Sequence, residues 1–226
     1  MGLILCIETS TEVCSVCLSK DGIAVTTKEI NEPNKHASLL SPLIDEVLKT
    51  SGHTFNQLDA VAVSKGPGSY TGLRVGVSTA KGLCYGLDKP LIAVPTLQAL
   101  AALAQKQIST ENSYLLIPMI DARRMEVFTA TYNHLLEETT ATHAHIIDEN
   151  SFASQQLSSY FFGNGAAKCV ATLTHPNLHY VANIQCSASG MSALAEAAFE
   201  EKRFEDVAYF EPYYLKDFVG TTPKNK

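Results

Sequence analysis

Glycine-rich stretches that follow predicted strands are the first candidates for chemistry in this sequence. The stretch SKGPGSYTGLRVG, residues 64–76, holds four of the chain's 13 glycines. A shorter one, GNGA, occupies residues 163–166, and the polar turn ETST follows the first apolar run at residues 8–11. Backbone amides at the start of a helix can bind an anion such as phosphate. Neither glycine stretch matches the P-loop or the dinucleotide-binding pattern, so purely structural turns are the alternative interpretation.

Two carboxylates could add metal or acid–base chemistry to such loops. Glu8 and Asp121 each end an apolar run that we expect to be a strand, and α/β proteins place ligands at the carboxyl ends of their strands. A pair of carboxylates there could hold Mg²⁺ or a water molecule. The competing interpretation is that each carboxylate caps its own turn. The residues alone leave both interpretations open.

Cysteine and histidine patterns predict neither a metal site nor a redox site. Cys14 and Cys17 form a CxxC, but they lie in an alternating stretch that predicts a strand, where residues three apart point to opposite faces. We expect all six cysteines to be free thiols in a reducing compartment. The HxxxH of residues 175–179 contains Pro176 and is typical of a turn, and the HAH of residues 143–145 lacks a third ligand. Without an HExxH or GxSxG motif, no hydrolase site is predicted either.

The overall charge argues against direct binding of nucleic acid. Lys and Arg number 17 against 23 Asp and Glu, a net charge of −6, and the ARR of residues 122–124 is the one basic cluster. Surfaces that bind nucleic acid need several such residues. No apolar run reaches the ~20 residues of a membrane helix, and the N-terminus lacks the basic region of a signal peptide. We therefore expect a cytoplasmic protein without membrane contact.

Alternating strands and helices predict an α/β fold that is built twice. Residues 3–20 and 115–132 each suggest a strand with an acidic end, a short turn and a second strand, and aligning Glu8 with Asp121 sets them half a chain length apart. We expect helices over residues 36–49, 71–85, 97–107, 150–160 and 191–204, another after the GNGA turn, and strands at 59–64, 91–95 and 142–147.

The repeated opening divides the chain into two lobes. We expect an N-terminal lobe over residues 1–107 and a C-terminal lobe over residues 108–206, with the polar ISTENS of residues 108–113 at the joint. The tail, residues 207–226, begins with an aromatic and apolar segment that we expect to pack back on the N-terminal lobe. The predicted helix 71–85 is rich in Gly, Ser and Ala, which weakens an isolated helix by ~1 kcal/mol per glycine but lets another backbone approach closely. Together with helix 36–49 it suits docking between subunits.

Five motifs in this order resemble the bacterial TsaB (YeaZ) family: LILCIETST, KGPGSYTGLRVG, IDARRMEVF, FGNGAAK and PYYLK. The resemblance covers essentially the whole chain. Its departures are small: Tyr70 stands where the family typically has Phe, and the tail reads PYYLK where the family has P.YLR. NKHASLL keeps the family's histidine, here His36, but replaces the serine that usually follows it.

The resemblance implies a fold and a pathway. Members of the TsaB family have the ASKHA (actin, sugar kinase, Hsp70) fold, with two duplicated lobes that each hold a mixed sheet and flanking helices. They are accessory subunits in making N6-threonylcarbamoyladenosine beside the anticodon of tRNAs that read ANN codons. Their paralogue TsaD carries the metal-binding histidines and the transferase activity, and the ATPase TsaE joins the assembly. The HxxxH of this chain lies in its second half and does not match the TsaD site.

By similarity, we expect a non-catalytic scaffold subunit that pairs with TsaD through its N-lobe helices and forms a homodimer when alone. Candidate contact residues on the two helices are Leu40, Ile44, Val47, Gly72, Val75, Thr79 and Leu83. The glycine loops would be remnants of phosphate or nucleotide loops, represented by Thr9, Ser10, Gly66, Gly68, Ser69, Arg74, Gly163 and Gly165. Arg74 would either pair with a carboxylate of the partner or brace the lobe itself.

The resemblance implies no cofactor and no metal of the chain's own, with ATP or ADP expected, if anywhere, at the interface shared with TsaD. Transfer RNA would be met only through the complex. Two alternatives stay open. One is an active phosphotransferase or nucleotide-binding ATPase that uses Glu8, Asp121 and the loops around Gly68 and Gly165. The other, a glycoprotease-like metallopeptidase, is disfavoured because its metal-binding residues are missing.

Overall fold

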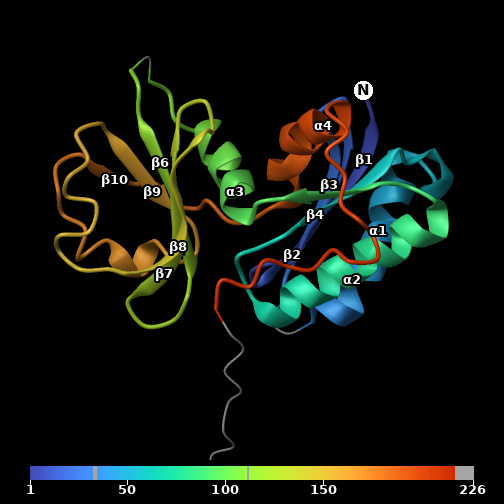
Figure 1. Ribbon diagram of the computed structural model, residues 1–226, viewed down its shortest axis with the longest axis horizontal. Helices are drawn as coiled ribbons and strands as arrows, with labels where there is room; N and C mark the ends of the chain where they lie inside the picture. The colour runs from blue at the N-terminus through green and yellow to red at the C-terminus, as the bar shows by residue number, and fades with distance from the viewer. Residues whose placement is uncertain (33–34, 111, 217–226) are drawn as a thin grey trace, which may run out of the picture.

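Two lobes stand side by side in the computed structural model, which describes residues 1–32, 35–110 and 112–216 (Figure 1). Each lobe is built around a five-stranded sheet. The first sheet contains β1 (Leu3–Glu8), β2 (Val13–Lys20), β3 (Ile23–Asn31), β4 (Ala60–Ser64) and β5 (Leu91–Val94). The second contains β6 (Leu115–Asp121), β7 (Glu126–Asn133), β8 (Glu138–Ile146), β9 (Ser159–Phe162) and β10 (Leu178–Tyr180).

The two sheets have the same topology. The first has the order β3-β2-β1-β4-β5 and the second, taken from the matching edge, β8-β7-β6-β9-β10. In each sheet the first three strands along the chain form an antiparallel meander, and the last two add in parallel to the central strand. The predicted duplication and the ASKHA-type fold with a mixed sheet in each lobe are therefore confirmed.

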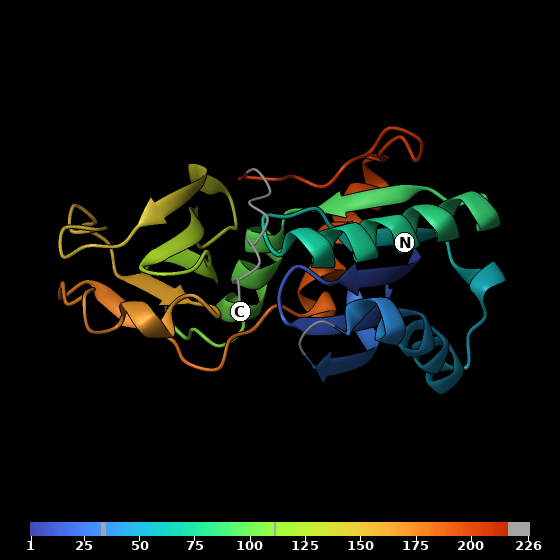
Figure 2. The same ribbon diagram turned by 90° about the horizontal axis from the view of Figure 1, so that it is seen from below.

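Two long helices cover one face of the first sheet. These are α1 (His36–Ser51) and α2 (Tyr70–Leu87), which lie side by side in both ribbon views (Figures 1 and 2). The helix α1 ends at Gly52, which takes the left-handed conformation that only glycine adopts without strain. The helix α2 begins after Ser69, whose hydroxyl accepts a hydrogen bond from the Gly72 amide at 3.3 Å. Both helices match their predicted positions within two residues at each end.

The central strand β1 is buried on both faces, which explains its unbroken apolar run. Leu5 and Ile7 point into the core beneath α1 and α2, whereas Ile4 and Cys6 belong to a second core on the opposite face. The neighbouring strand β2 divides its cysteines in the same way, since Cys14 lies in the first core and Cys17 in the second. The prediction that this CxxC spans two faces of a strand is confirmed, and all six cysteines are buried and free.

The last helix of each half packs on the sheet of the other lobe. The helix α3 (Thr96–Gln105) follows β5 but packs on β6, between the lobes in Figure 1. The helix α4 (Ser192–Glu200), with the 3₁₀ turn Ala188–Met191 before it, covers the second face of the first sheet. The lobe limits 1–107 and 108–206 stay a prediction, and both helices near these limits pack across them: α3 contributes Ala99 to the core of the first sheet and Leu100 to that of the second.

The chain then returns along the N-terminal lobe. Val207 and Phe210 pack on the core beneath α1 and α2, and the Tyr213 amide donates a hydrogen bond to the Lys65 carbonyl oxygen at 2.7 Å. Farther on, Lys216 forms an ion pair with Glu126 of the C-terminal lobe. The tail thus lies against the N-terminal lobe as far as residue 214 and then reaches the other lobe; residues 217–226 of the predicted tail lie outside the described residues.

One predicted helix, residues 150–160, is wrong. The structure has turns there, followed directly by β9. The Ser151 hydroxyl accepts a hydrogen bond from the Asp148 amide and donates one to the Asp148 carboxylate, and Phe152 takes a left-handed conformation with φ at +61°. Such local side-chain bonds offer the backbone an alternative to helical hydrogen bonds. The helix expected after GNGA is likewise only the 3₁₀ turn Ala167–Cys169.

None of the helices in the described residues combines the length and apolar character needed to cross a membrane.

Candidate functional site

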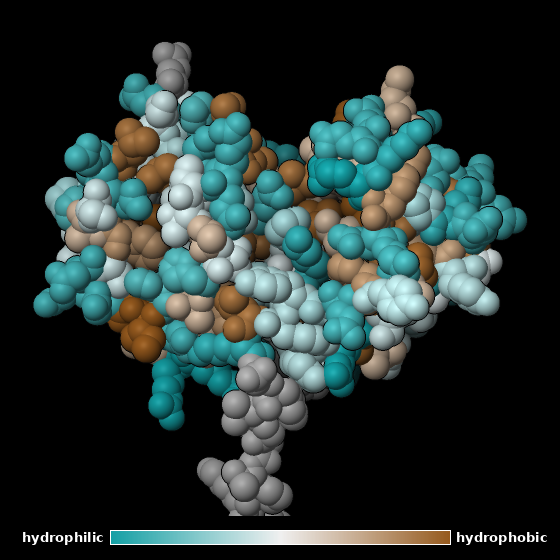
Figure 3. Space-filling view, in the orientation of Figure 1, coloured by the Kyte–Doolittle hydropathy of each residue, from teal (hydrophilic) through white to brown (hydrophobic). Residues whose placement is uncertain are grey.

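The main candidate site is a cavity of about 620 Å³ between the lobes. From the N-terminal lobe it is lined by the β1–β2 turn, the start of α1 and the first turn of α2; from the C-terminal lobe, by the β6–β7 turn and Asn164. Residues 214–216 of the tail complete the wall. The space-filling view shows the lobes separated by a notch at their upper edge, with a mostly hydrophilic face (Figure 3).

The glycines of residues 64–76 are required by the chain's own backbone. A Cβ atom added at Gly68 would lie 2.4 Å from the Ser10 carbonyl oxygen, and one added at Gly72 would lie 2.1 Å from that of Thr9. The Ser69 amide donates a hydrogen bond to the same Ser10 oxygen at 2.6 Å. The β1–β2 turn therefore occupies the space beside the glycine loop that a phosphate would need. Of the predicted loop residues here, Ser10, Gly68 and Ser69 still line the cavity, whereas Thr9 does not.

The C-terminal lobe repeats this packing. Gly163 has φ at +107°, and an added Cβ would lie 2.3 Å from the Met119 carbonyl oxygen. At Gly165 the added atom would lie 2.8 Å from the Asp121 amide nitrogen. The glycines after β9 thus let their loop press against the end of β6, as those after β4 let theirs press against the end of β1. Neither Gly163 nor Gly165 lines the cavity.

Gly66 packs against the C-terminal tail and not against the β1–β2 turn. With φ at +111°, it lies under the tail, where an added Cβ would be 2.5 Å from the Tyr213 carbonyl oxygen. Its amide donates to the Thr96 hydroxyl at 3.1 Å, so one glycine joins the loop, α3 and the tail. Of the eight predicted loop residues, Gly66 therefore holds the tail and does not face the cavity.

The two predicted carboxylates are not brought together at one site. Glu8 is 1% exposed and does not line the cavity; its Oε1 accepts from the Ser10 amide at 2.6 Å and from the Ser64 hydroxyl at 3.0 Å. Burial raises the pKa of the Glu8 carboxyl, while these hydrogen bonds oppose the shift. Asp121 does line the cavity, but it forms an ion pair with Lys168 and accepts from the Arg123 amide. Each carboxylate thus holds its own turn, as the second interpretation of the sequence had it.

Arg74 braces the lobe from outside. Its guanidinium carbon lies 4.3 Å from the centre of the Tyr70 ring, and its Nε donates to the Tyr214 hydroxyl at 3.3 Å. The Tyr70 and Tyr214 rings lie 4.5 Å apart, so the arginine holds the tail against α2. Of the two predicted roles for Arg74, internal bracing is the one that its contacts show.

The histidines form no metal site among the described residues, where no group of three or more His, Cys, Asp or Glu could hold an ion. His143 and His145 share one face of β8, with ring centres 5.4 Å apart, and the His145 Nε2 lies 3.0 Å from the Ser151 hydroxyl. His179 lies on β10 and His175 in the turn before it, which confirms that the HxxxH is not helical.

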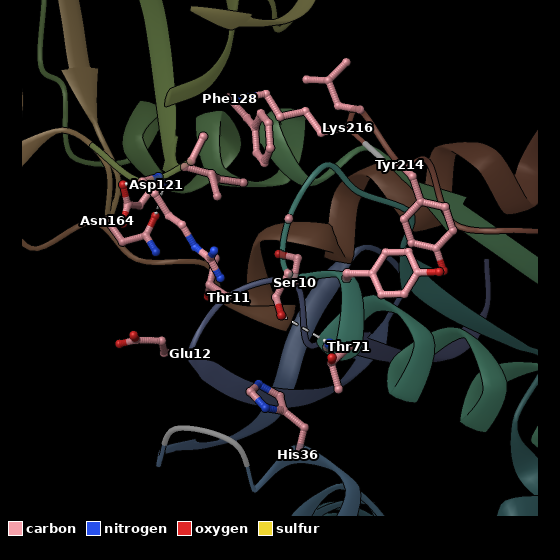
Figure 4. Close-up of a pocket in the computed structure, with 18 of the residues that line it drawn as sticks. Ser10, Thr11, Glu12, His36, Thr71, Asp121, Phe128, Asn164, Tyr214 and Lys216 are labelled. Atoms are coloured by element: carbon pink, nitrogen blue, oxygen red, sulfur yellow. Dashed lines mark hydrogen bonds between the residues drawn. The ribbon is translucent and has the colours of Figure 1, made fainter. Parts of the chain in front are cut away.

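Among the lining residues that sequence reasoning missed as site residues are His36, Arg123, Tyr214 and Lys216. Close up, His36 lies near Thr71 and Ser10 on one side, with Asp121 and Asn164 on the other and Tyr214 and Lys216 along the rim (Figure 4). The basic cluster ARR was the available signal for Arg123. Nothing in the sequence indicates that Lys216, 90 residues after Glu126, reaches this rim, because that contact is a product of the tertiary fold alone.

Comparison with known proteins places this architecture in a family. The sequence model of TsaD, the tRNA N6-adenosine threonylcarbamoyltransferase, matches residues 30–224. The protein "tRNA threonylcarbamoyladenosine biosynthesis protein TsaB" of Haemophilus influenzae is 42% identical over 125 residues, 55% of this chain and 51% of that protein. Its Escherichia coli K12 counterpart is 38% identical over 129 residues, 57% and 54% of the two chains. The solved structure of YeaZ from Pseudomonas aeruginosa superposes with a TM-score of 0.79 at 27% identity, covering 95% of this chain and 100% of that one.

The chain belongs to the family of the transferase TsaD, in its TsaB (YeaZ) branch. It spans about half the length of the curated TsaB relatives it matches. The solved YeaZ structure, in contrast, is covered over its whole length. The resemblance read from the five sequence motifs is therefore confirmed.

For a TsaB-family chain, the residues expected to meet a partner need partial correction. Leu40, Ile44 and Val47 are at most 3% exposed and form the core between α1 and the first sheet. Gly72 is buried against Thr9. A helix of this kind buries one face, and the predicted residues of α1 lie on that face. Val75, Thr79 and Leu83 of α2 are only half-buried and stay candidates.

The outer face of α2 has a composition that packing inside the chain does not explain. A Cβ atom added at Gly82 or at Gly86 would meet nothing within 4 Å. Between them on the same helix, Tyr85 is 87% exposed. Glycine destabilises a helix interior by ~1 kcal/mol, so two open glycines on one helix face are a cost that packing within the chain does not offset. This TsaB-family surface, defined by Thr79, Gly82, Leu83, Tyr85 and Gly86, is called the α2 face below.

Proposed function

We propose that this chain works in tRNA threonylcarbamoyladenosine biosynthesis as a scaffold subunit that pairs with a TsaD-type transferase through the α2 face. Kinship with curated TsaB proteins over more than half of the chain supports the pathway. The match of residues 30–224 to the TsaD family model supports a partner that shares its ancestry with this chain.

The observation that carries the pairing surface is the pair of open glycines on α2. Gly82 and Gly86 lie one helical turn apart, so together they expose backbone along one line of the helix. A helix of the partner could approach this line closely, with Tyr85 packing beside it as an aromatic anchor. The half-buried Thr79 and Leu83 border the same surface.

In this proposal the chain provides a binding surface for its partner, and the partner provides the catalytic residues. The buried Glu8 and the paired Asp121 support this division, because neither carboxylate is free to act on a substrate. The ATPase TsaE would join the assembly, and ATP or ADP would bind, if at all, where this chain meets TsaD. The net charge of −6 supports contact with tRNA only through the complex. Without its partner, the chain would form a homodimer through the α2 face.

A substitution at Gly82 can weaken binding of the partner without weakening the fold, so it tests the two separately. Gly82→Gln adds a good helix former where a side chain meets no atom of the chain, so we expect the free energy of unfolding to rise by up to ~1 kcal/mol. The added side chain would hold the partner helix away, so we expect capture of TsaD to fall at least about tenfold, with a matching loss of tRNA modification in a mixture reconstituted with TsaD and TsaE. Denaturant titration, pull-down and nucleoside analysis measure the three quantities.

Ala197→Gln is the matched control, because Ala197 is an exposed small residue on α4, on the opposite face of the first sheet. It should leave capture and modification unchanged. Full capture of TsaD by the folded Gly82→Gln variant would refute the α2 face as the pairing surface. Modification at full rate with this chain omitted, or ATP turnover by the chain alone, would refute the scaffold role itself.

A further inference from the structure

Packed chain segments join the two lobes at one place. The helix α3 contributes Ala99 to the core of the first sheet and Leu100 to that of the second. On the way back, Cys186 belongs to the core of the second sheet and Ala188 to that of the first. These two connections touch, since a Cβ atom added at Gly190 would lie 2.5 Å from the Ala99 carbonyl oxygen. Two connections that cross side by side form a hinge about which the lobes can rotate.

The tail connects the lobes again at a distance from this hinge. Lys216 forms an ion pair with Glu126, the first residue of β7. Residues 214–216 line the cavity between the lobes, whereas Ala99 and Gly190 of the hinge do not. In Figure 1 the red tail reaches the space between the lobes below α3. A contact at this position opposes a rotation of the lobes that widens the cavity.

The N-terminal lobe holds the tail by several contacts ahead of that ion pair. The Lys81 ammonium donates a hydrogen bond to the carbonyl oxygen of Phe210 at 2.9 Å, and the Tyr213 amide donates to that of Lys65 at 2.7 Å. Lys216 follows Tyr213 by three residues. Three residues of extended chain span at most about 11 Å. The backbone of Lys216 therefore stays near the N-terminal lobe, whatever the position of the other lobe.

The ion pair at the end of the tail is weak and reversible. Its side chains are 46% exposed at Lys216 and 21% exposed at Glu126. Within the described part of the chain, neither charged group has another ion pair. Exposed pairs of this kind are screened by salt, and they shift an equilibrium by at most about fivefold. The pair therefore breaks and re-forms readily, while the rest of the tail stays attached.

We propose that residues 208–216 form a latch between the lobes. The tail is anchored on the N-terminal lobe, and Lys216 binds Glu126 reversibly. The closed latch limits rotation about the hinge and holds the cavity near its observed volume of about 620 Å³. The open latch leaves the C-terminal lobe free to rotate away. The latch lies within one chain and needs neither a partner nor a ligand, so this inference goes beyond the pairing function and can fail independently of it.

Distances between the lobes measure the latch directly. Spin labels would be attached at Asp45→Cys in α1 and at Glu149→Cys after β8, two exposed positions on different lobes. The six native cysteines are buried, and labelling of the chain without these two substitutions gives the background. A large excess of unlabelled chain suppresses distances between copies. Double electron–electron resonance then gives the distribution of separations at low and at high salt.

Loss of the ion pair should shift the lobes towards longer separations. We expect Lys216→Met to raise the ratio of long to short separations by about two- to fivefold at low salt, and high salt to do the same for the unmodified chain. Lys216→Glu combined with Glu126→Lys reverses the pair and should restore the short separations. Lys28→Met is the matched control, because it removes an exposed ion pair with Glu46 inside the N-terminal lobe. It should leave the distribution unchanged.

Three results would overturn the latch. The same distribution for Lys216→Met and for the unmodified chain would show that the ion pair does not limit the lobes. An equal change in Lys28→Met would show a general effect of charge. Failure of the reversed pair to restore the short separations would show that Lys216 acts through a contact other than Glu126.

Discussion

At the scale of single residues, Glu8 shows how burial changes what a carboxylate can do. Its position at the end of β1 is where a ligand-binding acid would stand, yet its oxygen is used by Ser10 and Ser64. The side chain is 1% exposed, so its negative charge is separated from water. Removal from water disfavours the ionised form and raises the pKa of the carboxyl, despite the two hydrogen bonds.

The raised pKa makes a prediction about pH and stability. A carboxyl whose pKa is higher in the folded than in the unfolded chain binds more protons when folded, so it favours folding at low pH and loses this contribution as pH rises through the folded pKa. Glu8→Gln cannot titrate. We expect the free energy of unfolding of the unmodified chain, minus that of Glu8→Gln, to fall as the pH rises above the ordinary carboxyl value of 4.5 in denaturant titrations. With Glu149→Gln, an exposed control, the difference should not follow this course; a constant difference for Glu8→Gln would contradict the prediction.

The glycines make a second point at the residue scale. For their clustering in residues 64–76 the sequence left an anion site and structural turns open, and the group that lies against Gly68 and Gly72 is the chain's own β1–β2 turn. A sequence shows that a position tolerates no side chain, and it does not show which atoms fill the space. For this reason the sequence around Gly68 and Gly165 suggests phosphate loops, whereas in the structure these glycines pack against the residues at the ends of β1 and β6.

At the scale of elements, α2 combines three environments along one helix. Its first turns press on Thr9, its middle holds the returning tail, and its last turns expose the open glycines. The tail is held by Lys81, whose ammonium donates to the carbonyl oxygens of Ala208 at 3.1 Å and Phe210 at 2.9 Å. Hydrogen bonds from a charged donor are worth more than neutral ones, so Lys81 is a principal attachment of the tail.

Removal of that ammonium should release the tail while the lobe stays folded. Lys81→Met keeps the length of the side chain and loses both hydrogen bonds, so we expect amides of residues 208–214 to exchange with solvent at least about tenfold faster. The amide of Tyr213, bonded to the Lys65 carbonyl, is the reporter, followed by hydrogen-exchange mass spectrometry. Lys49→Met, on the exposed side of α1, serves as control. Unchanged exchange in the tail would assign its attachment to Tyr70, Arg74 and Tyr214 instead.

At the scale of the whole molecule, the two lobes are not independent folding units. The helix α4 comes from the end of the chain and covers the face of the first sheet that contains Ile4, Cys6 and Ile92. In return α3 packs on β6 of the second lobe. Each sheet therefore needs a helix from the other half of the chain to close its core.

Because each sheet is covered by a helix from the other half of the chain, the behaviour of fragments can be predicted. Residues 1–94 alone leave the apolar face under α4 open, so we expect that fragment to aggregate or to lack dispersed amide resonances. Joining residues 1–94 through a flexible linker to residues 187–216 restores the 3₁₀ turn, α4 and the tail, and should give a soluble fragment with dispersed ¹H–¹⁵N spectra. A folded, soluble fragment 1–94 would show that the α4 contact is dispensable.

Local patterns in the sequence determined most of the elements and the family. The apolar runs of β1 and β6, the helical spacing of α1 and α2 and the five motifs depend on neighbours in the chain, and each was predicted close to its observed place. The repeated opening predicted a duplicated fold, and the two sheets do share one strand order. The helix expected over residues 150–160 failed because Ser151 and Asp148 form local side-chain bonds that a periodicity of apolar residues does not reveal.

Only the tertiary structure decided which helix face is buried, which lobe each final helix joins, and which residues meet at the cavity. Leu40 and Val47 fit an outer face or a core equally well by spacing, and the sheet beneath α1 settles the choice. Arg123, His36 and Tyr214 come from three distant parts of the chain. Their meeting depends on how two sheets and a returning tail pack together, and packing between distant segments leaves no periodic trace in the sequence.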